Sequence, residues 1–170
     1  MARGFRGESV HKVDQKGRVS VPAPFRRVLE EGDPDWSAGL NPNFVLIYGM
    51  PGSARLEGYT IEGIGKIDDA VSRMPRFSKS RAILERMLNT KSVYAQVDEN
   101  GRIVLPVRLR ELIGLDGEAL FAGMGDKFQV WAPDAFGIDD GDLENALAEL
   151  DANDRNPLDE LDRIEFGDAP

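Results

Sequence analysis

Polar and apolar residues alternate from His11 to Val21, and the alternation is broken only by three residues, 15–17. A period of two is typical of a β-strand that buries one face and exposes the other. The break reads Gln-Lys-Gly and follows an aspartate, a composition favoured in tight turns between paired strands. The pattern therefore predicts a β-hairpin in which Asp14 lies opposite Arg18.

This hairpin places its side chains on two different faces. Its other predicted pairs are Val13 with Val19, Lys12 with Ser20, and His11 with Val21. The polar face carries Lys12, Asp14, Arg18 and Ser20. His11, the only histidine of the chain, lies on the apolar face, so we expect a packed or hydrogen-bonded core residue rather than a ligand or a catalyst.

The same pattern recurs 84 residues further along the chain. Residues 14–22 read DQKGRVSVP and residues 98–106 read DENGRIVLP, so that Asp, Gly, Arg and Pro occur in register. A second similarity at the same spacing, between FVLIY at 44–48 and FQVW at 128–131, indicates one more strand in each copy. The sequence therefore predicts an internal duplication.

Each hairpin is followed by a short helical pattern. Pro22 and Pro106 end the returning strands, because proline cannot donate a hydrogen bond to a neighbouring strand. Apolar residues then follow at helical spacing, namely Phe25, Val28 and Leu29 in the first copy and Leu109, Leu112 and Ile113 in the second. One copy has too small an apolar face to be stable alone. Two copies packed face to face predict a β-rich α+β fold, a pseudo-twofold barrel built from two tandem repeats with connecting helices.

We divide the chain into four parts on this basis. They are a first repeat at residues 1–52, a helical connection at 53–91, a second repeat at 92–137 and an acidic extension at 138–170. Apolar spacing predicts two helices in the connection, around Ile64–Met74 and Ile83–Leu88, of which the second is rich in basic residues. The extension is expected to hold one short amphipathic helix around Leu143–Leu150 and to be disordered from about Asn153 onward.

The formal net charge of −9 hides a strong asymmetry. Residues 133–170 contain thirteen acidic residues and two arginines, a balance of −11. Residues 1–27 contain seven basic and two acidic residues, a balance of +5. The amino-terminal part is therefore suited to a polyanionic partner although the whole chain is acidic.

Several classes of protein are not supported by the sequence. The chain has no cysteine, which excludes disulfides and thiolate metal sites and is compatible with the cytoplasm. No apolar run approaches the roughly 20 residues of a membrane-spanning helix, and no secretory signal is expected. The glycines between 58 and 65 lack the Gly-Lys-Ser/Thr of a phosphate loop, and the Asp68-Asp69 and Asp139-Asp140 pairs point apart on predicted helices. We therefore expect no enzyme, no cofactor, and neither catalytic nor metal-binding residues.

The motifs of the amino-terminal part resemble those of the MraZ family. In order, they are Gly4-Phe5-Arg6-Gly7, His11, Asp14-Gln15-Lys16-Gly17-Arg18, Val21-Pro22-Ala23 and Phe25-Arg26. The duplicated Asp-x-x-x-Arg at 14–18 and 98–102 is the mark of that family, and it resembles the swapped-hairpin, double-split β-α-β barrel of AbrB-type regulators. The resemblance covers about residues 3–137 and leaves the acidic end outside.

This resemblance implies a bacterial DNA-binding regulator of the division and cell-wall gene cluster. Such a protein binds double-stranded DNA at short direct repeats in the promoter, and it assembles into a ring-shaped homo-oligomer, an octamer or a dodecamer. It is cytoplasmic and nucleoid-associated, with no membrane and no small-molecule substrate among its partners.

The basic residues of the first copy are the candidate DNA contacts, because arginines on a rigid hairpin reach phosphates with little further ordering. They are Arg3, Arg6, Lys12, Lys16 and Arg18. In the second copy Glu99 and Asn100 occupy the positions of Gln15 and Lys16, so Arg102 is the only basic residue of that turn segment. The residues expected to structure the two turns are Asp14, Gly17, Asp98, Gly101 and Arg102.

A different class of protein also fits part of the sequence. The chain could be a protein-interaction scaffold or an antitoxin-like module whose acidic tail binds a basic partner. Removal of residues 139–170 separates the two hypotheses, since a regulator keeps or gains DNA affinity while an interaction module loses its partner.

Overall fold

A computed structural model describes residues 3–49 and 54–165 of the chain. By their internal contacts the residues divide into two compact units, 1–133 and 134–170. The first unit contains the predicted first repeat and helical connection and the second repeat as far as residue 133, and the second unit contains residues 134–137 and the whole acidic extension. Among the described residues, no helix has the length and the apolar composition that crossing a membrane requires.

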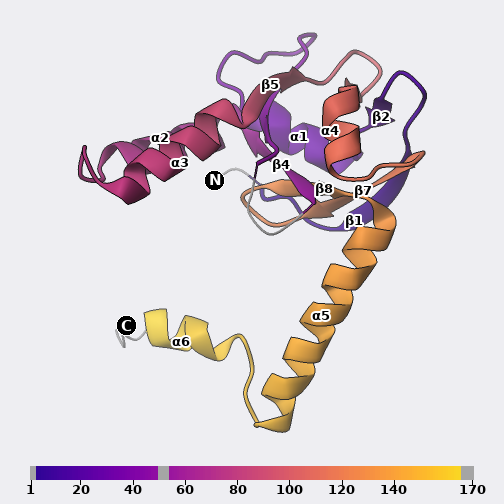
Figure 1. The fold of residues 1–170 in the computed structure, drawn as a ribbon. Coiled ribbons are helices and arrows are strands. Elements are labelled where there is room, and N and C mark those ends of the chain that lie inside the picture. The colour runs from indigo at the N-terminus through magenta and orange to yellow at the C-terminus, as the bar shows by residue number, and fades with distance from the viewer. Residues whose placement is uncertain (1–2, 50–53, 166–170) are drawn as a thin grey trace. The chain divides into compact units, whose positions relative to one another are not determined.

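The elements follow one another in the same order in the two halves of the chain (Figure 1). The first half contains β1 (Glu8–Lys12), β2 (Arg18–Ser20), α1 (Ala23–Glu31), β3 (Asn43–Ile47), β4 (Arg55–Thr60), α2 (Ile61–Ser72) and α3 (Lys79–Thr90). The second half contains β5 (Ser92–Gln96), β6 (Arg102–Val104), α4 (Val107–Leu112), β7 (Glu118–Gly123), β8 (Phe128–Trp131), α5 (Pro133–Ala152) and α6 (Asp159–Glu165). The duplication therefore includes the helices that follow β4 and β8.

The strands form an antiparallel sheet of six, in the order β1-β7-β8-β4-β3-β5, and a separate ribbon of β2 and β6. The order of the sheet is unchanged when every strand is exchanged with its counterpart in the other repeat. A pseudo-twofold axis therefore passes between β4 and β8, and the predicted α+β fold of two tandem repeats is confirmed. These pairings form an open sheet and a ribbon, and among the described residues they do not close into one barrel.

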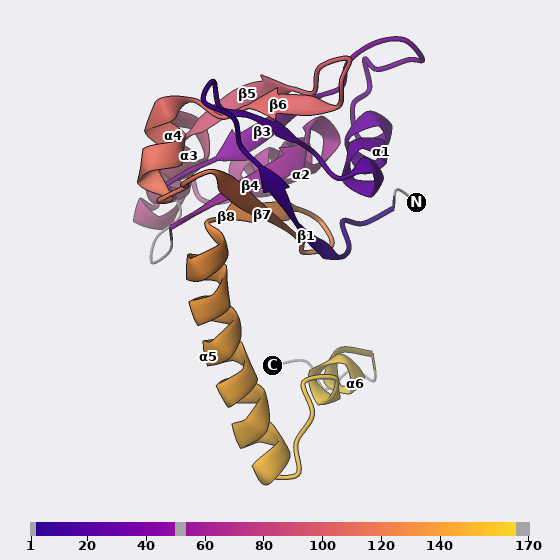
Figure 2. The same cartoon turned by 90° about the vertical axis from the view of Figure 1, so that its right-hand side faces the viewer.

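The hairpin predicted for the first copy is correct for its two pairs nearest the turn, Asp14 with Arg18 and Val13 with Val19, and wrong beyond them. Val13 and Val19 form a bridge, but β1 then pairs with β7 and β2 pairs with β6 (Figure 2). The predicted pairs of Lys12 with Ser20 and of His11 with Val21 are therefore not made. The two strands separate because each of them completes its hydrogen bonds with a strand of the other repeat. The predicted faces are nevertheless correct, since Val19 and Val21 are buried.

The similarity between residues 44–48 and 128–131 connects two strands that are not counterparts. β3 pairs with β5 as β7 pairs with β1, so that β3 corresponds to β7 and β4 corresponds to β8. The segment between α1 and β3 is longer than the one between α4 and β7, which changes the spacing of the later strands. The structure confirms a strand at each of the two places. The prediction that these two strands correspond to each other at the spacing of 84 residues is wrong.

Five phenylalanines from both repeats form the centre of the core, together with apolar residues of α1 and α4. The ring of Phe128 lies within 5.2 to 5.9 Å of four of them, measured between ring centroids, namely Phe5, Phe25, Phe44 and Phe121. Gly58 on the neighbouring strand β4 makes room for this ring, because an added Cβ would collide with it. The core is thus shared by the two repeats and belongs to neither alone.

A buried carboxylate lies on the pseudo-twofold axis, on the opposite face of the sheet. Glu57 is 0% exposed and lies opposite its counterpart Gln129, whose Nε2 donates a hydrogen bond of 3.1 Å to Glu57 Oε2. Arg55 Nε donates to the same oxygen at 3.0 Å, and Lys127 Nζ lies 3.3 Å from it. Tyr59 donates its hydroxyl to the other carboxylate oxygen at 3.4 Å. The carboxylate is thus paired on all sides, as a buried charge must be.

This network predicts a stability that depends on pH. Burial raises the pKa of Glu57, but the Arg55 hydrogen bond, the Lys127 charge and the Gln129 amide together lower it by more. The pKa of Glu57 therefore lies below its ordinary value. Its contribution is therefore present at neutral pH and is lost as the pH falls through the lowered pKa. We expect Glu57→Gln to reduce the free energy of unfolding at pH 7 by about 3 kcal/mol, because Arg55 and Lys127 lose their ion pairs with this carboxylate.

Urea denaturation at pH 7 and at about pH 3 measures this difference. Glu62→Gln is the matched control, since Glu62 is half exposed in its ion pair with Lys66 and such pairs contribute little. The free energies of unfolding of the Glu57 variant and the wild-type chain should differ less at about pH 3 than at pH 7. An equal difference at both pH values would contradict the stabilising role assigned to the ionised Glu57.

The second unit consists of α5, a turn and α6. None of its described residues is buried. α5 is longer than the short helix predicted around Leu143–Leu150, and α6 lies in the segment for which the sequence predicts disorder. Partial disorder of the extension and the four predicted parts of the chain stay predictions. Residues 1, 2, 50–53 and 166–170 of those parts lie outside the described residues.

Candidate nucleic-acid interface

The first Asp-x-x-x-Arg segment forms a tight turn organised by one carboxylate. Asp14 Oδ1 accepts hydrogen bonds from the backbone amides of Lys16 at 3.0 Å and Arg18 at 2.9 Å. Asp14 Oδ2 accepts a third hydrogen bond, of 2.6 Å, from Arg18 Nε. Gly17 closes the turn with φ +84°, in the left-handed region that glycine adopts without strain. The guanidinium of Arg18 is therefore held in one orientation while its side chain stays partly exposed.

These contacts keep the carboxylate of Asp14 ionised. The hydrogen bond from the Arg18 amide lowers the pKa of Asp14, burial opposes this effect, and the Arg18 guanidinium and the Lys16 amide lower the pKa further. The ionised form is the one that can accept all three hydrogen bonds. The turn is therefore fixed over the whole neutral range of pH.

The second turn has the same backbone but a different side-chain arrangement. Asp98 Oδ1 accepts hydrogen bonds from the amides of Asn100 at 2.8 Å and Arg102 at 2.9 Å, and Gly101 has φ +74°. In the described part of the chain, no ion pair joins the Asp98 and Arg102 side chains, and Arg102 Nε is buried without a hydrogen-bond partner. Arg102 thus takes part in this turn through its backbone amide.

Each turn is completed by the other repeat. The amide of Leu105 donates to the carbonyl of Gly17 at 2.8 Å, and the amide of Val21 donates to the carbonyl of Gly101 at 3.0 Å. Arg110 of α4 lies against Gly17 and donates its Nε to the carbonyl of Leu105 at 2.9 Å. The first turn therefore has a third basic residue beside Lys16 and Arg18, contributed by the second repeat.

Sequence reasoning missed Arg110 and its counterpart Arg26, whose guanidinium packs against Gly101 of the second turn. Both arginines lie eight residues beyond the arginine of their own motif, at equal positions in the two repeats. The equal spacing of eight residues could have identified this pair of arginines from the sequence. It could not have shown that each arginine lies at the turn of the other repeat, because that depends on the exchange of strand partners.

The ribbon of β2 and β6 presents both motif arginines on one side. Val19 and Ile103 are paired at its centre and are almost completely buried. Their neighbours alternate to the other face, where Arg18 lies opposite Val104 and Arg102 lies opposite Ser20. Two-stranded ribbons of this kind are one of the elements with which proteins enter a DNA groove.

The other predicted contacts lie away from the first turn. Lys12 is exposed at the end of β1, opposite Glu118 of β7. Arg3 and Arg6 flank Phe5, which pairs with Gly125 near the other end of β1. The structure thus brings Lys16 and Arg18 together, places Lys12 two residues before the turn, and separates Arg3 and Arg6 from it.

Arg3 and Arg6 instead meet an arginine of α1. Together with Arg27 they line a cavity of about 450 Å³ between the amino-terminal segment and α1, completed by Gly4, Pro24 and Val28. Of the described residues that line this cavity none is acidic, and a neighbouring carboxylate oxygen, Glu31 Oε2, accepts a hydrogen bond of 3.4 Å from the amide of Arg3. The protein therefore presents two separate basic clusters, one at the first turn and one beside α1.

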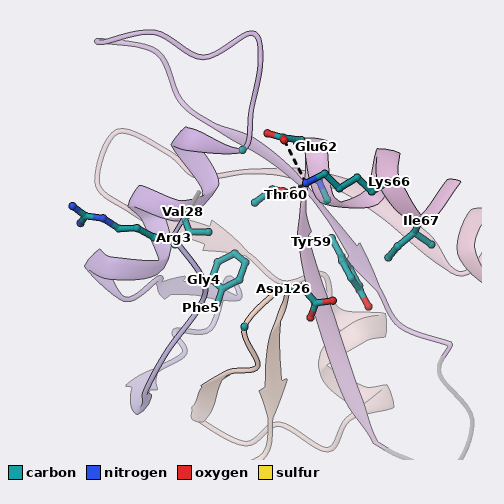
Figure 3. A pocket seen from close by; sticks show the side chains of 13 residues that line it. Arg3, Gly4, Phe5, Val28, Tyr59, Thr60, Glu62, Lys66, Ile67 and Asp126 are labelled. Atoms are coloured by element: carbon teal, nitrogen blue, oxygen red, sulfur yellow. Dashed lines mark hydrogen bonds and ion pairs between the residues drawn. The ribbon is translucent and has the colours of Figure 1, made fainter. Parts of the chain in front are cut away.

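A second cavity near Arg3, of about 380 Å³, has a mixed charge (Figure 3). It lies beside the start of α2, where Glu62 and Lys66 form an ion pair of 3.6 Å. The amides of Glu62 and Gly63 donate to Gly32 and Thr60, so these donors are already used. Arg3 points away from the other labelled side chains. This cavity offers no gathering of groups for catalysis, and no group of metal-ligating side chains occurs among the described residues.

His11 lies opposite Ala119 and not opposite Val21, but it is packed and hydrogen-bonded. Its Nε2 lies 2.8 Å from Ser9 Oγ, within hydrogen-bonding distance, and its ring packs edge to face on Phe121 at 5.6 Å. Burial lowers the pKa of His11, which favours the neutral ring. The expectation of a packed or hydrogen-bonded residue is confirmed, although His11 is half-buried at the margin of the core and does not belong to its buried cluster.

The doubled β-rich fold and its Asp-organised basic turns define a protein of the AbrB-like, swapped-hairpin class. Comparison with known proteins agrees. A family model described as "MraZ protein, putative antitoxin-like" matches residues 89–154, from the end of α3 through α5. Proteins named transcriptional regulator MraZ from Ruegeria sp. (strain TM1040) and Ruegeria pomeroyi are each 49% identical, over 95% of this chain and 97% of their own length. The relative from Parvibaculum lavamentivorans is 42% identical over 78% of both chains.

The chain belongs to the MraZ family of transcriptional regulators. The resemblance stated from the amino-terminal motifs is thereby confirmed. The family is one of regulators and not of enzymes, which agrees with the prediction made from the residues.

Proposed function

We propose that the protein regulates transcription by binding double-stranded DNA through its first turn. The observation that supports this is the fixed guanidinium of Arg18, held by Asp14 at 2.6 Å beside Lys16 and Arg110 on an exposed ribbon. A pre-oriented cation binds a phosphate or a base edge with little loss of side-chain entropy. The remaining predicted contacts, Lys12, Arg3 and Arg6, add positive charge along β1 and beside α1.

The second turn has a structural role in this proposal. Glu99 lies at its tip and repels phosphate, and Asp98 and Gly101 hold its backbone. Asp14 and Gly17 do the same for the first turn. The first turn is thus proposed to contact DNA and the second to support the fold. The two loops differ at two positions between the aspartate and the glycine, which are Gln15 and Lys16 in the first loop and Glu99 and Asn100 in the second.

The proposed operator is a set of short direct repeats in the promoter of the division and cell-wall gene cluster, and the proposed binding form is a ring of identical subunits at the nucleoid. One turn neutralises few phosphates and binds weakly. Several turns presented by a ring convert the later contacts into intramolecular ones, which raises the overall affinity. Identical subunits in a cyclic order match repeats that all have the same direction.

Fluorescence anisotropy with labelled duplexes tests this function. We expect tight binding to the chain's own upstream region, weaker binding to a duplex with a single repeat and much weaker binding to a scrambled duplex. The logarithm of the affinity should fall linearly with the logarithm of salt concentration. Equal affinity for the upstream and the scrambled duplex at fixed salt would contradict sequence-specific regulation.

A further inference from the structure

Three arginines with free charges line one cavity of the first unit. Arg3, Arg6 and Arg27, the α1 cluster, surround the cavity of about 450 Å³ beside α1. All three are exposed, and their guanidinium groups make no ion pair or hydrogen bond within the described part of the chain. The guanidinium of Arg18, in contrast, is paired with Asp14. The α1 cluster therefore directs three free cations toward a common space.

The fold holds this cluster in place before any ligand binds. The amide of Phe5 donates to the carbonyl of Gly125 at 2.7 Å, and the amide of Gly125 donates to the carbonyl of Phe5 at 2.9 Å. The ring of Phe5 packs edge to face on Phe25 of α1, with 5.4 Å between the centroids. The segment with the two amino-terminal arginines is thus fixed against the helix that carries Arg27. A site that is already ordered loses less entropy when it binds.

The charge of the cluster indicates the class of ligand. Like charges around one cavity repel one another, and a bound anion removes this repulsion. The two acids nearby leave the guanidinium groups free. Glu31 accepts from the backbone amide of Arg3, and Glu30 forms no ion pair in the described part of the chain. Arginine binds phosphate through parallel N–H···O bonds, and phosphate offers more charge and more acceptor oxygens than a carboxylate. The chemistry therefore favours a phosphate group.

The cluster is a property of the first repeat and not of the fold. The positions 84 residues later are occupied by Met87, Thr90 and Glu111. The second repeat forms the same strands and the same helix without these three cations. The cluster thus occurs in the repeat whose turn contains Lys16, and the architecture does not require it.

The α1 cluster is also separate from the first turn. The five residues of β1 lie between them, and a strand of this length spans about 16 Å. This span is much longer than one phosphate group. A phosphate bound by the cluster therefore leaves the first turn free for its own contact.

We propose that the α1 cluster is a phosphate-binding site that acts separately from the first turn. Two sources supply this chemistry, namely the backbone of a duplex that the first turn holds and a free phosphate compound. The first source rests on the proposed function, because it requires bound DNA, and the second does not. The proposal adds Arg27 to the binding residues and gives Arg3 and Arg6 a defined ligand group.

Calorimetric titration of the full chain with pyrophosphate, in chloride buffer at constant ionic strength, tests the site without DNA. The variant Arg6→Gln/Arg27→Gln removes two guanidinium groups from exposed positions. Its control, Arg73→Gln/Arg76→Gln, removes the same charge from two exposed arginines that do not line the cavity. We expect the control to bind within about twofold of the wild-type chain and the variant to bind roughly tenfold more weakly or worse. A similar loss in the variant and the control would reduce the site to general attraction of charge and overturn the proposal.

Fluorescence anisotropy identifies the source of the phosphate. The duplexes contain a single repeat, with and without about 10 base pairs of flanking DNA on each side. If the DNA backbone is the source, the variant should lose roughly tenfold in affinity for the flanked duplex, with a salt dependence shallower by about two contacts. It should equal the wild-type chain on the short duplex. If a free compound is the source, the variant should equal the control on both duplexes and still lose pyrophosphate binding.

The two measurements separate this proposal from the proposed function. A wild-type chain that binds no upstream duplex contradicts the DNA function, and the pyrophosphate titration then decides the site alone. A variant that equals the control in both measurements overturns the phosphate site and leaves the first turn as the proposed DNA contact. Circular dichroism and sedimentation velocity compare the fold and the assembly of both variants with those of the wild-type chain.

Discussion

Replacement of Arg18 by alanine is expected to lower the affinity for the upstream duplex by roughly 10- to 100-fold, the equivalent of about 1 to 3 kcal/mol for one oriented arginine. The variant keeps the Arg18 amide, and with it two of the hydrogen bonds that Asp14 accepts from the turn. The turn should therefore stay folded, and the loss should come from the missing guanidinium. The salt dependence of binding should become shallower by about one phosphate contact per site.

The matched control is Arg102→Ala in the second copy of the same motif. Its guanidinium makes no ion pair with Asp98 within the described part of the chain, and the backbone of its turn has the same hydrogen bonds. We expect its affinity to stay within about twofold of the wild-type value, because the Arg102 guanidinium lies outside the proposed DNA contact. Anisotropy titrations at one salt concentration compare the two variants, with sedimentation showing that both still assemble. An equal loss in both would mean that the two turns share the contact.

Replacement of Phe128 by alanine should have the largest effect on folding. Its ring contacts four other phenylalanine rings from both repeats, and its side chain is completely buried. Truncation of a buried phenylalanine costs about 3 to 5 kcal/mol, because burial is lost and a cavity remains. That is a large part of the stability of an ordinary domain.

Phe77→Ala is the control for this change, since the same atoms are removed from a side chain that is 96% exposed. Its free energy of unfolding should differ from that of the wild-type chain by less than about 0.5 kcal/mol. Urea denaturation followed by tryptophan fluorescence and by circular dichroism measures both variants. A loss below about 1 kcal/mol for Phe128→Ala would show that this ring is not at the centre of the core.

Local features of the fold were predictable from the sequence because their cause is local. The turn at Asp14 follows from a carboxylate, a glycine and their spacing, and the helix after Pro22 follows from three apolar residues. The faces of the strands were also predictable, since alternation depends only on burial. Alternation does not identify the partner strand, however, so the exchange of partners between repeats was implied only by the resemblance to swapped-hairpin barrels and not by the residues themselves.

Two strands were not predicted for physical reasons that the structure explains. β4 contains Glu57 and Gly58, which do not resemble a strand interior, yet the first is neutralised by Arg55 and Lys127 and the second makes room for a ring. β7 has the apolar run of a buried strand, but it is not 84 residues from its counterpart β3, so the spacing of the duplicated motif did not reveal it. At the site, Lys16 and Arg18 follow from the motif, whereas Arg110 requires knowledge of the exchanged strands.

The dependence of each turn on the opposite repeat also bears on how such a chain arose. A single repeat could complete its turn only by pairing with a second molecule of itself, and both turns of that dimer would have been identical. Joining two copies in one gene removed this constraint. The two loops could then differ, and in this chain the first has a lysine at residue 16 and the second has a glutamate at residue 99. A fused chain can therefore have different side chains in the two loops of one symmetric fold. One loop can change its side chains for binding while the other continues to hold the strands of the two repeats together.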